Sequence, residues 1–258
     1  MKIATFNVNG ITARLPRLLE WLDETSPDIA CLQELKTSDE TFPVDSLREL
    51  GYSAVWHGQK SWNGVAVLAK GDEVVERRRG LPGDPDDTHS RYIEASAHGI
   101  VVASIYLPNG NPQPGPKFAY KLAWFERLTA HAASLVDSDQ TVVLAGDYNV
   151  VASDEVCDIY SPRSYLNDAL LQPETRSAYR SLLAQGWTDS IAKVHPGAPI
   201  YTYWDYFRNR FPRDAGLRID HLLLNAPAAS RLVGAGVDRH VRARDKPSDH
   251  APTWIVLS

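Results

Sequence analysis

The chain has little cysteine and no long apolar run. Of its 258 residues only Cys31 and Cys157 are cysteines. A disulfide framework is therefore excluded, and neither residue belongs to a Cys-x-x-Cys pair of the zinc-binding type. No segment approaches the roughly 18 apolar residues of a membrane span, and the first residues lack the apolar stretch of a signal peptide. We therefore expect a cytoplasmic protein that does not enter a membrane.

An excess of basic residues is also missing, since the formal net charge is −5. This balance argues only weakly against a nucleic-acid partner, because enzymes that use metal-bound phosphate chemistry concentrate acidic residues at the site. The basic residues that are present form clusters at 77–79, 208–210 and 239–246. The sequence contains no Gly-rich phosphate loop of the Walker type and no Gly-x-Ser-x-Gly elbow. Two common kinds of catalytic site are thereby excluded.

Apolar periodicity predicts a chain in which strands and helices are mixed. Helices are expected at 15–24, 46–50, 118–136 and 175–185. Strands are expected at 3–8, 29–33, 53–57, 64–69, 92–97, 100–107, 141–145, 188–191, 217–224 and 254–257. Two strand-rich halves with flanking helices predict an α/β fold, in which two sheets pack face to face with helices outside. Asn7-Val8-Asn9 and Asp147-Tyr148-Asn149 each follow a strand and suggest a weak internal repeat.

Polar side chains stand where several of the predicted strands end or begin. Asn7 lies in the first strand after an apolar run, and Glu34 directly follows the second. Asp147 follows the strand at 141–145, and Asp249-His250 precede the last one. Side chains at the ends of buried strands can point into a shared crevice, where a metal ion or a phosphate is held. This pattern indicates a functional site rather than a set of unrelated loops.

Three acidic and amide positions carry the clearest chemistry. Asp147 and Asn149 lie two apart, so an extended backbone puts both on one side. A carboxylate there can orient or deprotonate a water, and the amide can hold that water or a developing oxyanion. The same residues also occur in turns that satisfy their own backbone. Asp220 lies within an apolar run and needs a cationic partner, for which His250 is a candidate.

Glu34 and Tyr106 supply two further groups at strand ends. Glu34 offers oxygen ligands of the kind that Mg²⁺ prefers, and the Tyr106 hydroxyl can bind a phosphate oxygen. Taken singly, Asn7, Glu34 and Tyr106 also fit ordinary turn, strand-end and packing roles. Taken together, these residues form one hard-metal oxygen site with an imidazole beside it. That combination predicts metal-assisted hydrolysis of a phosphate ester.

Eight segments in order resemble the motifs of the exonuclease III family of AP endonucleases, within the wider endonuclease/exonuclease/phosphatase superfamily. They span almost the whole chain, and His57-Gly58-Gln59-Lys60 and the segment 246–252 are similar to the bacterial exonuclease III branch. The eight segments are Phe6-Asn7-Val8-Asn9-Gly10, Leu32-Gln33-Glu34-Leu35-Lys36, Asn63-Gly64-Val65-Ala66, Tyr106-Leu107-Pro108-Asn109-Gly110, Gly146-Asp147-Tyr148-Asn149, Tyr201-Thr202-Tyr203-Trp204, Gly216-Leu217-Arg218-Ile219-Asp220 and Ser248-Asp249-His250.

The resemblance implies a single catalytic domain over 1–258, a four-layer sandwich of two β-sheets flanked by helices with a pseudo-two-fold repeat. It implies a bacterial, cytoplasmic DNA repair nuclease that is used at the nucleoid and depends on Mg²⁺ or Mn²⁺. The sequence does not give the oligomeric state, and a monomer is the default expectation. Such enzymes act on double-stranded DNA with abasic or 3′-blocked sites. They cleave the phosphodiester 5′ to an abasic site, and many also remove nucleotides 3′→5′ and strip 3′ phosphates.

The resemblance also assigns residues to roles. The metal-binding set that it implies is Asn7, Glu34, Asp147, Asn149 and Asp249. The catalytic set is Tyr106, Asp147, Asn149, Asp220 and His250. The DNA-binding set is Asn109, Lys121, Tyr203, Trp204, Arg208, Leu217 and Ile219, in which Tyr203, Leu217 and Ile219 match an apolar pocket for a flipped abasic sugar.

Two alternative functions stay open on the sequence. A phosphatase of the same fold, acting on a small phosphoester or a phospholipid head group, would share the site chemistry. A non-catalytic DNA-binding module would lack one or more of Glu34, Asp147, Asp249 and His250, and all four are present. The segment 161–174 and the prolines at 112–116 match the family poorly, so the balance between exonuclease and abasic-site cleavage stays open.

Overall fold

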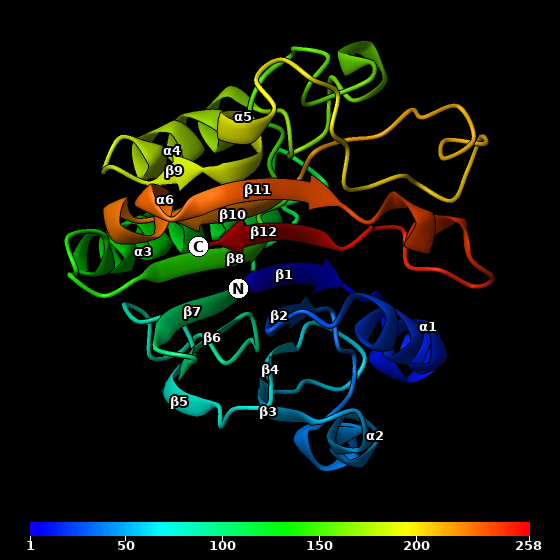
Figure 1. The fold of residues 1–258 in the computed structure, drawn as a ribbon. Helices are drawn as coiled ribbons and strands as arrows, with labels where there is room; N and C mark the ends of the chain where they lie inside the picture. The colour runs from blue at the N-terminus through cyan, green and yellow to red at the C-terminus, as the bar shows by residue number, and fades with distance from the viewer.

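The computed structural model describes residues 1–258 and consists of two mixed six-stranded sheets that face each other (Figure 1). The first sheet contains, in spatial order, β11 (Leu232–Val237), β12 (Thr253–Leu257), β1 (Lys2–Asn7), β2 (Ile29–Gln33), β4 (Val65–Lys70) and β3 (Tyr52–His57). The second sheet contains β5 (Val75–Arg79), β6 (Tyr92–Ala97), β7 (Ile100–Tyr106), β8 (Val142–Asp147), β10 (Asp220–Leu224) and β9 (Thr188–Asp189).

Side-chain alternation along the central strands explains the layered core. In β1, Ile3 faces the core between the sheets, whereas Ala4 faces the helices on the outer side. Helices α1 (Ile11–Thr25) and α2 (Val44–Glu49) cover the outer face of the first sheet. Helices α3 (Pro116–Val136) and α4 (Pro173–Leu183) cover that of the second. The layers therefore run helix, sheet, sheet, helix, as the sequence predicts (Figure 1).

Strand pairing reveals a two-fold repeat in the topology. Strands β1–β6 and β7–β12 make the same pairs in the same order, with one parallel pair in each half, β1 with β2 and β7 with β8. Each half places four strands in one sheet and contributes its last two, β5 and β6 or β11 and β12, to the other. The halves therefore exchange strands, which ties the two sheets into one core.

The repeat aligns different residues from those that the sequence suggested. Asn7 pairs with Gln33 across β1 and β2, and Tyr106 pairs with Asp147 across β7 and β8. Asn7 is therefore equivalent to Tyr106, and Gln33 is equivalent to Asp147. The likeness between Asn7-Val8-Asn9 and Asp147-Tyr148-Asn149 does not mark the repeat, because these segments end non-equivalent strands.

The remaining differences from the predicted elements are at the edges of the sheets. Strand β5 was not predicted because all five of its residues are exposed and four are charged, and β11 was not predicted because it contains two glycines. The strand expected at 188–191 stops at Asp189, where α5 (Ser190–Val194) begins. The charges of β5 are consistent with its place at a sheet edge, where charged side chains discourage pairing with another chain. The shorter helices are η1 (Asp39–Thr41), η2 (Pro162–Ser164), α6 (Ala226–Ser230) and η3 (Arg239–Ala243).

Each helix of the structure is too short or too polar to cross a lipid bilayer.

Candidate active site

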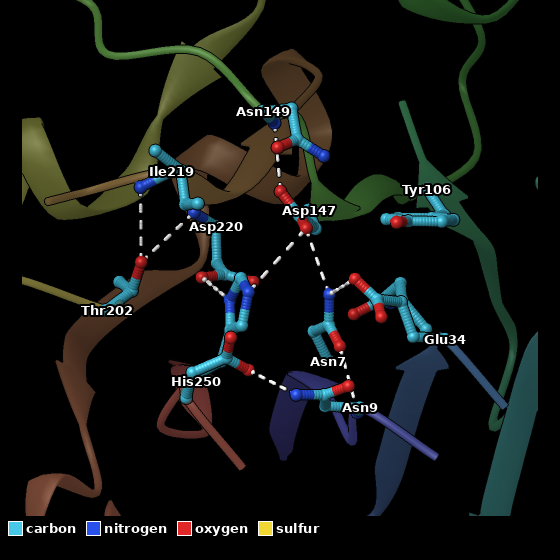
Figure 2. A network of polar contacts seen from close by, with 12 residues as sticks. Asn7, Asn9, Glu34, Tyr106, Asp147, Asn149, Thr202, Ile219, Asp220 and His250 are labelled. Atoms are coloured by element: carbon cyan, nitrogen blue, oxygen red, sulfur yellow. Dashed lines mark hydrogen bonds and ion pairs between the residues drawn. The ribbon is translucent and has the colours of Figure 1, made fainter. Parts of the chain in front are cut away.

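The central strands of the two sheets end beside one another and bring the predicted polar residues together. Asn7 ends β1, Asp147 ends β8, and Asp220 begins the neighbouring antiparallel strand β10, directly opposite Asp147. His250 reaches the same place from the segment before β12. All four side chains are at least 96% buried. Figure 2 shows Asn7, Asp147 and His250 turned toward one another.

The Asp147 carboxylate lies at the centre of this group. Its Oδ1 accepts a hydrogen bond from the backbone N–H of Asn149 at 2.9 Å, and its Oδ2 accepts one from Nδ2 of Asn7 at 3.0 Å. Nε2 of His250 lies 3.8 Å from the same Oδ2. Burial raises the pKa of Asp147, although the nearby His250 opposes that change. The carboxylate is therefore held in one orientation and is basic enough to accept a proton.

His250 and Asp220 form a buried ion pair. Nδ1 of His250 lies 2.8 Å from Oδ2 of Asp220. Burial disfavours the charged imidazole, but Asp220 and Asp147 outweigh it and raise the pKa of His250 to about 10. The Thr202 hydroxyl accepts the backbone N–H groups of Ile219 and Asp220, both at 3.1 Å, and so fixes the start of β10. The sequence expectation that Asp220 needs a cationic partner agrees with this geometry.

Glu34 stands beside Asn7 on the first sheet. Its Oε1 accepts a second hydrogen bond from Nδ2 of Asn7 at 2.9 Å, and its Oε2 lies 2.8 Å from Nζ of Lys36. Burial would raise the pKa of Glu34, but Lys36 and Asn7 lower it overall. Glu34 therefore stays ionised. Tyr106, whose own pKa is raised by burial and by Glu34, lies on the other side of this carboxylate.

Asp249 joins the group through a residue that the sequence did not single out. Nδ2 of Asn9 donates to Oδ1 of Asp249 at 3.0 Å, and Oδ1 of Asn9 accepts from Nζ of Lys36 at 2.6 Å. Asn9 and Lys36 thus connect Asp249 to Glu34. Asn9, Glu34 and Lys36 all have left-handed backbones, with φ between 48° and 53°. Such strain at non-glycine residues is typical of functional sites.

A small pocket of about 170 Å³, termed the apolar pocket after one of its walls, is lined on its polar side by Glu34, Asp147, Asp249 and His250. Tyr203, Leu217 and Ile219 line it, as the family resemblance implies. Leu170 lines it too and packs in the same apolar cluster, together with Tyr165 and Asp168 at the rim. Sequence reasoning missed these three residues because the segment 161–174 carries neither clear periodicity nor a recognisable motif.

Lys121 was assigned to DNA contact, and the structure corrects this. The side chain is completely buried, and Nζ donates to the backbone carbonyls of Asn109 and Asn149, at 3.0 and 2.6 Å. Burial lowers the pKa of Lys121 to about 7. Asn109 in turn donates from Nδ2 to Oδ1 of Asn149 at 3.1 Å. Lys121 therefore supports Asn149, which has a left-handed backbone, and does not reach the surface.

Trp204 is the second corrected assignment. Its side chain is 1% exposed, its indole N–H donates to Asp214 at 3.1 Å, and its ring packs against Phe211. It is a core residue at the base of the loop 205–215, so it cannot stack on DNA. Arg208 is exposed on that loop and lines a hollow that shares Tyr165 with the apolar pocket.

The donor groups of the site fit a hard divalent cation. Asn7, Glu34, Asp147 and Asp249 offer oxygens and no thiolate, which favours Mg²⁺ or Mn²⁺ over zinc. Asp147, Asp220 and His250 also place ligand atoms within 4.8 Å of one another. However, a protonated imidazole has no lone pair for a metal ion, and Nδ1 of His250 is held by Asp220. The carboxylates on the Glu34 side are therefore better metal ligands than the group of Asp147, Asp220 and His250. Within that group, Oδ1 of Asp220 is buried and has no hydrogen-bond partner.

The arrangement can hydrolyse a phosphate ester. Asp147 offers an oriented base, and His250 offers a buried cation 3.8 Å from it. A phosphate bound over this pair would meet positive charge from the imidazolium and a water held by the carboxylate. Tyr203, Leu217 and Ile219 form the apolar wall of the same pocket and can contact a small uncharged group.

Comparisons with known proteins agree with this geometry. Residues 4–250 match the model of the endonuclease/exonuclease/phosphatase family. Exodeoxyribonuclease III of Haemophilus influenzae is 35% identical, over 98% of this chain and 98% of that protein. The structure of an AP endonuclease from Archaeoglobus fulgidus is 37% identical with a TM-score of 0.95, covering 100% of this chain and 99% of that one. That of a 3′ phosphatase (NExo) from Neisseria bound to product DNA hairpin is 38% identical with a TM-score of 0.94, at the same coverage. The chain therefore belongs to the endonuclease/exonuclease/phosphatase family.

Proposed function

We propose that the protein is a divalent-metal-dependent DNA repair nuclease that hydrolyses the phosphodiester 5′ to abasic sites. The observation that carries this proposal is the pocket of about 170 Å³ in which an apolar wall of Tyr203, Leu217 and Ile219 adjoins the Asp147–His250 pair. Ordinary ligand pockets hold about 300–1,000 Å³. The pocket is therefore small for a whole nucleotide and suits a sugar that has lost its base.

The side chains divide the reaction between them. Asp147, held by Asn149 and Asn7, accepts the proton of the attacking water. His250, kept protonated by Asp220, stabilises the charge that develops on the phosphate oxygens. Tyr106 contacts the same phosphate from the end of β7. Glu34, Asn7 and Asp249 would hold the divalent ion, with Asp147 and Asn149 next to it, and the bound ion would neutralise phosphate charge.

The apolar wall gives a reason for damage selection. Leu217 and Ile219 cannot hydrogen-bond a base edge, because their side chains are aliphatic. An abasic nucleotide has no base to unstack or unpair, so its extrusion from the duplex costs less than that of an intact nucleotide. The pocket therefore favours the lesion by size and by the cost of flipping. Asn109 and Arg208 are the proposed contacts to the DNA backbone outside this pocket.

Two further activities belong to the proposal. The relatives include a protein named exodeoxyribonuclease III and one described as a 3′ phosphatase. A 3′-terminal nucleotide or phosphate presents the same phosphate ester to the same water-activating carboxylate. We include 3′→5′ exonuclease and 3′-phosphatase activities on double-stranded DNA, and a monomeric enzyme, in the proposed function.

The proposed function predicts cleavage of a duplex that carries one abasic analogue. In Mg²⁺ or Mn²⁺ the labelled strand should be cut 5′ to the analogue, and in EDTA it should stay intact, because the carboxylates need the ion to hold the phosphate. A denaturing gel of the end-labelled strand measures this. An undamaged duplex, inositol phosphates and sphingomyelin are the comparison substrates. Faster hydrolysis of either small phosphoester, or nicking that EDTA does not stop, would contradict the proposal.

A further inference from the structure

A groove lies next to the apolar pocket, on the far side of Glu34 and Tyr106. It has a volume of about 540 Å³ and shares Glu34, Tyr106 and Asn109 with that pocket, so the two adjoin. None of the reaction steps derived above uses the rest of its lining. The further lining residues that matter here are His89, Arg91, Lys117 and Tyr120.

Arg91 presents an unpaired positive charge in the groove. Its guanidinium stacks on the ring of Tyr106, with Cζ 4.7 Å from the ring centroid, and Nη1 donates to the Tyr106 carbonyl at 3.2 Å. No carboxylate lies within 4.0 Å of it, and its Nε is buried without a hydrogen-bond partner. A guanidinium that is fixed by stacking and has free donors is well suited to bind a phosphate.

His89 is held on the same side of the groove by a buried acid. Nδ1 of His89 lies 2.8 Å from Oδ1 of Asp87, and Tyr120 donates its hydroxyl to the same carboxylate at 3.0 Å. Arg127 pairs with the other oxygen of Asp87. Asp87 is therefore fixed by three side chains, and it directs the ring of His89. Nε2 of His89 has no protein partner, and in the imidazolium form it donates a hydrogen bond.

The charges of the lining favour an anion. Lys117 is exposed and has no acidic partner. Glu34 is the one acidic side chain among the lining residues, and its charge is matched by Lys36. The alternative to an anion site is that Arg91 only packs against Tyr106. A partly buried arginine that serves packing alone is expected to pair with a nearby carboxylate. Asp87 is close in sequence, but it pairs with Arg127 and leaves the charge of Arg91 without a carboxylate.

We propose that Arg91 and His89 form a second phosphate-binding site, which holds a backbone phosphate of the DNA strand near the phosphate that is cleaved. The inference rests on the proposed function for its ligand, a nucleic-acid strand, and adds a contact outside the reacting groups. Because the groove joins the apolar pocket at Tyr106, a strand that places its scissile phosphate at Asp147 can continue into the groove. Arg91 and His89 then fix the register of that strand.

Neutral linkages in the DNA test this site directly. Each duplex in a series carries one abasic analogue and one methylphosphonate linkage. The position of the methylphosphonate moves by one backbone phosphate from one duplex to the next, over the region near the lesion. Fluorescence anisotropy in EDTA measures the Kd of each duplex for the wild type, Arg91→Gln, His89→Gln and the control His240→Gln. His240 is an exposed histidine that pairs with Glu24 and does not line the groove.

Only the linkage that Arg91 and His89 bind is expected to change Kd strongly when its charge is removed. In the wild type, neutralising this linkage should raise Kd about tenfold, as expected for one charge-assisted contact. Arg91→Gln should raise Kd about tenfold on unmodified DNA and His89→Gln about threefold. The neutral linkage should then add less than about twofold in Arg91→Gln, and about threefold in His89→Gln, where Arg91 still binds the phosphate. His240→Gln should behave as the wild type. Equal sensitivity at all linkages, or effects that multiply fully in the variants, would overturn the inference. A failure of the proposed function would appear separately, as tight binding of abasic DNA without cleavage in Mg²⁺.

Discussion

Replacing Asp147 by asparagine is expected to lower kcat on abasic duplex DNA by about 10³-fold or more. Removal of a positioned general base typically costs 10²–10⁴-fold, and here the same carboxylate is also beside the proposed ion. An amide has one acceptor oxygen, whereas Asp147 uses both oxygens, for the N–H of Asn149 and for Nδ2 of Asn7. The loss should therefore lie toward the upper end of the range. Single-turnover kinetics in Mg²⁺ measure it.

This loss should occur without unfolding. Burial raises the pKa of Asp147, which means that the folded state does not gain from its negative charge. The melting temperature of Asp147→Asn should therefore equal or exceed that of the wild type, as is common when a functional charge is removed. Asp45→Asn is the matched control, since Asp45 is 90% exposed on α2. A variant that retains more than a tenth of the wild-type rate would refute the role given to Asp147.

The second large effect concerns His250. His250→Gln should lower kcat about 10³-fold, because it removes a buried cation that faces the phosphate, and one such donor is worth about 10²–10³-fold. In the wild type, activity should fall as pH rises through the pKa of His250, about 10, since the imidazolium is lost there. The Gln variant should lack this fall. Rates of abasic-site cleavage between pH 6 and 10.5 give both results.

Asp220 provides the internal check on this role. Asp220 acts through His250, to which it is bound at 2.8 Å, so Asp220→Asn added to His250→Gln should cost little more than His250→Gln alone. By itself Asp220→Asn should move the alkaline fall to lower pH, because it removes the neighbour that raises the pKa of His250. Two effects that multiply in full, or an unchanged alkaline limb, would mean that the pair does not work as a unit.

Much of the site could be predicted from the sequence because its residues end buried strands. A strand such as 29–33 is recognisable from five apolar or neutral residues. The polar residue that follows it, Glu34, is then a candidate site residue. The same holds for Asp147 at the end of β8 and for Asp220 within its apolar run. Strand ends are fixed by the sheet, so residues far apart in sequence can be expected to meet.

The rest depends on contacts that no local pattern encodes. Lysine is usually a surface residue, so the sequence gives no reason to expect Lys121 in the core. It is buried because its ammonium group donates hydrogen bonds to the backbone carbonyls of Asn109 and Asn149. Trp204 follows the pocket residue Tyr203, but alternation turns it to the opposite side, into the core. Leu170 enters the pocket from a segment without regular structure. Burial of each is decided by tertiary packing, not by the neighbours in sequence.

The internal repeat illustrates the same limit. Similar tripeptides after two strands suggested an equivalence of Asn7 with Asp147, but the sheet register pairs Asn7 with Gln33 and Tyr106 with Asp147. Hydrogen-bond register is a property of two strands, so one strand's sequence does not contain it. The correct correspondence also shows that the two halves of the site differ chemically, with an amide in one half where the other has a phenol.

The central claim is that oxygen ligands from Glu34, Asn7 and Asp249 gather around one divalent ion next to Asp147. Crystals soaked in Mn²⁺ and measured at the manganese absorption edge test it most directly. The account predicts an anomalous peak at about 2.1–2.2 Å from a carboxylate oxygen of Glu34, within the range for such metal–oxygen bonds. A peak bound instead by Asp220 and His250, or none at saturating Mn²⁺, would contradict it.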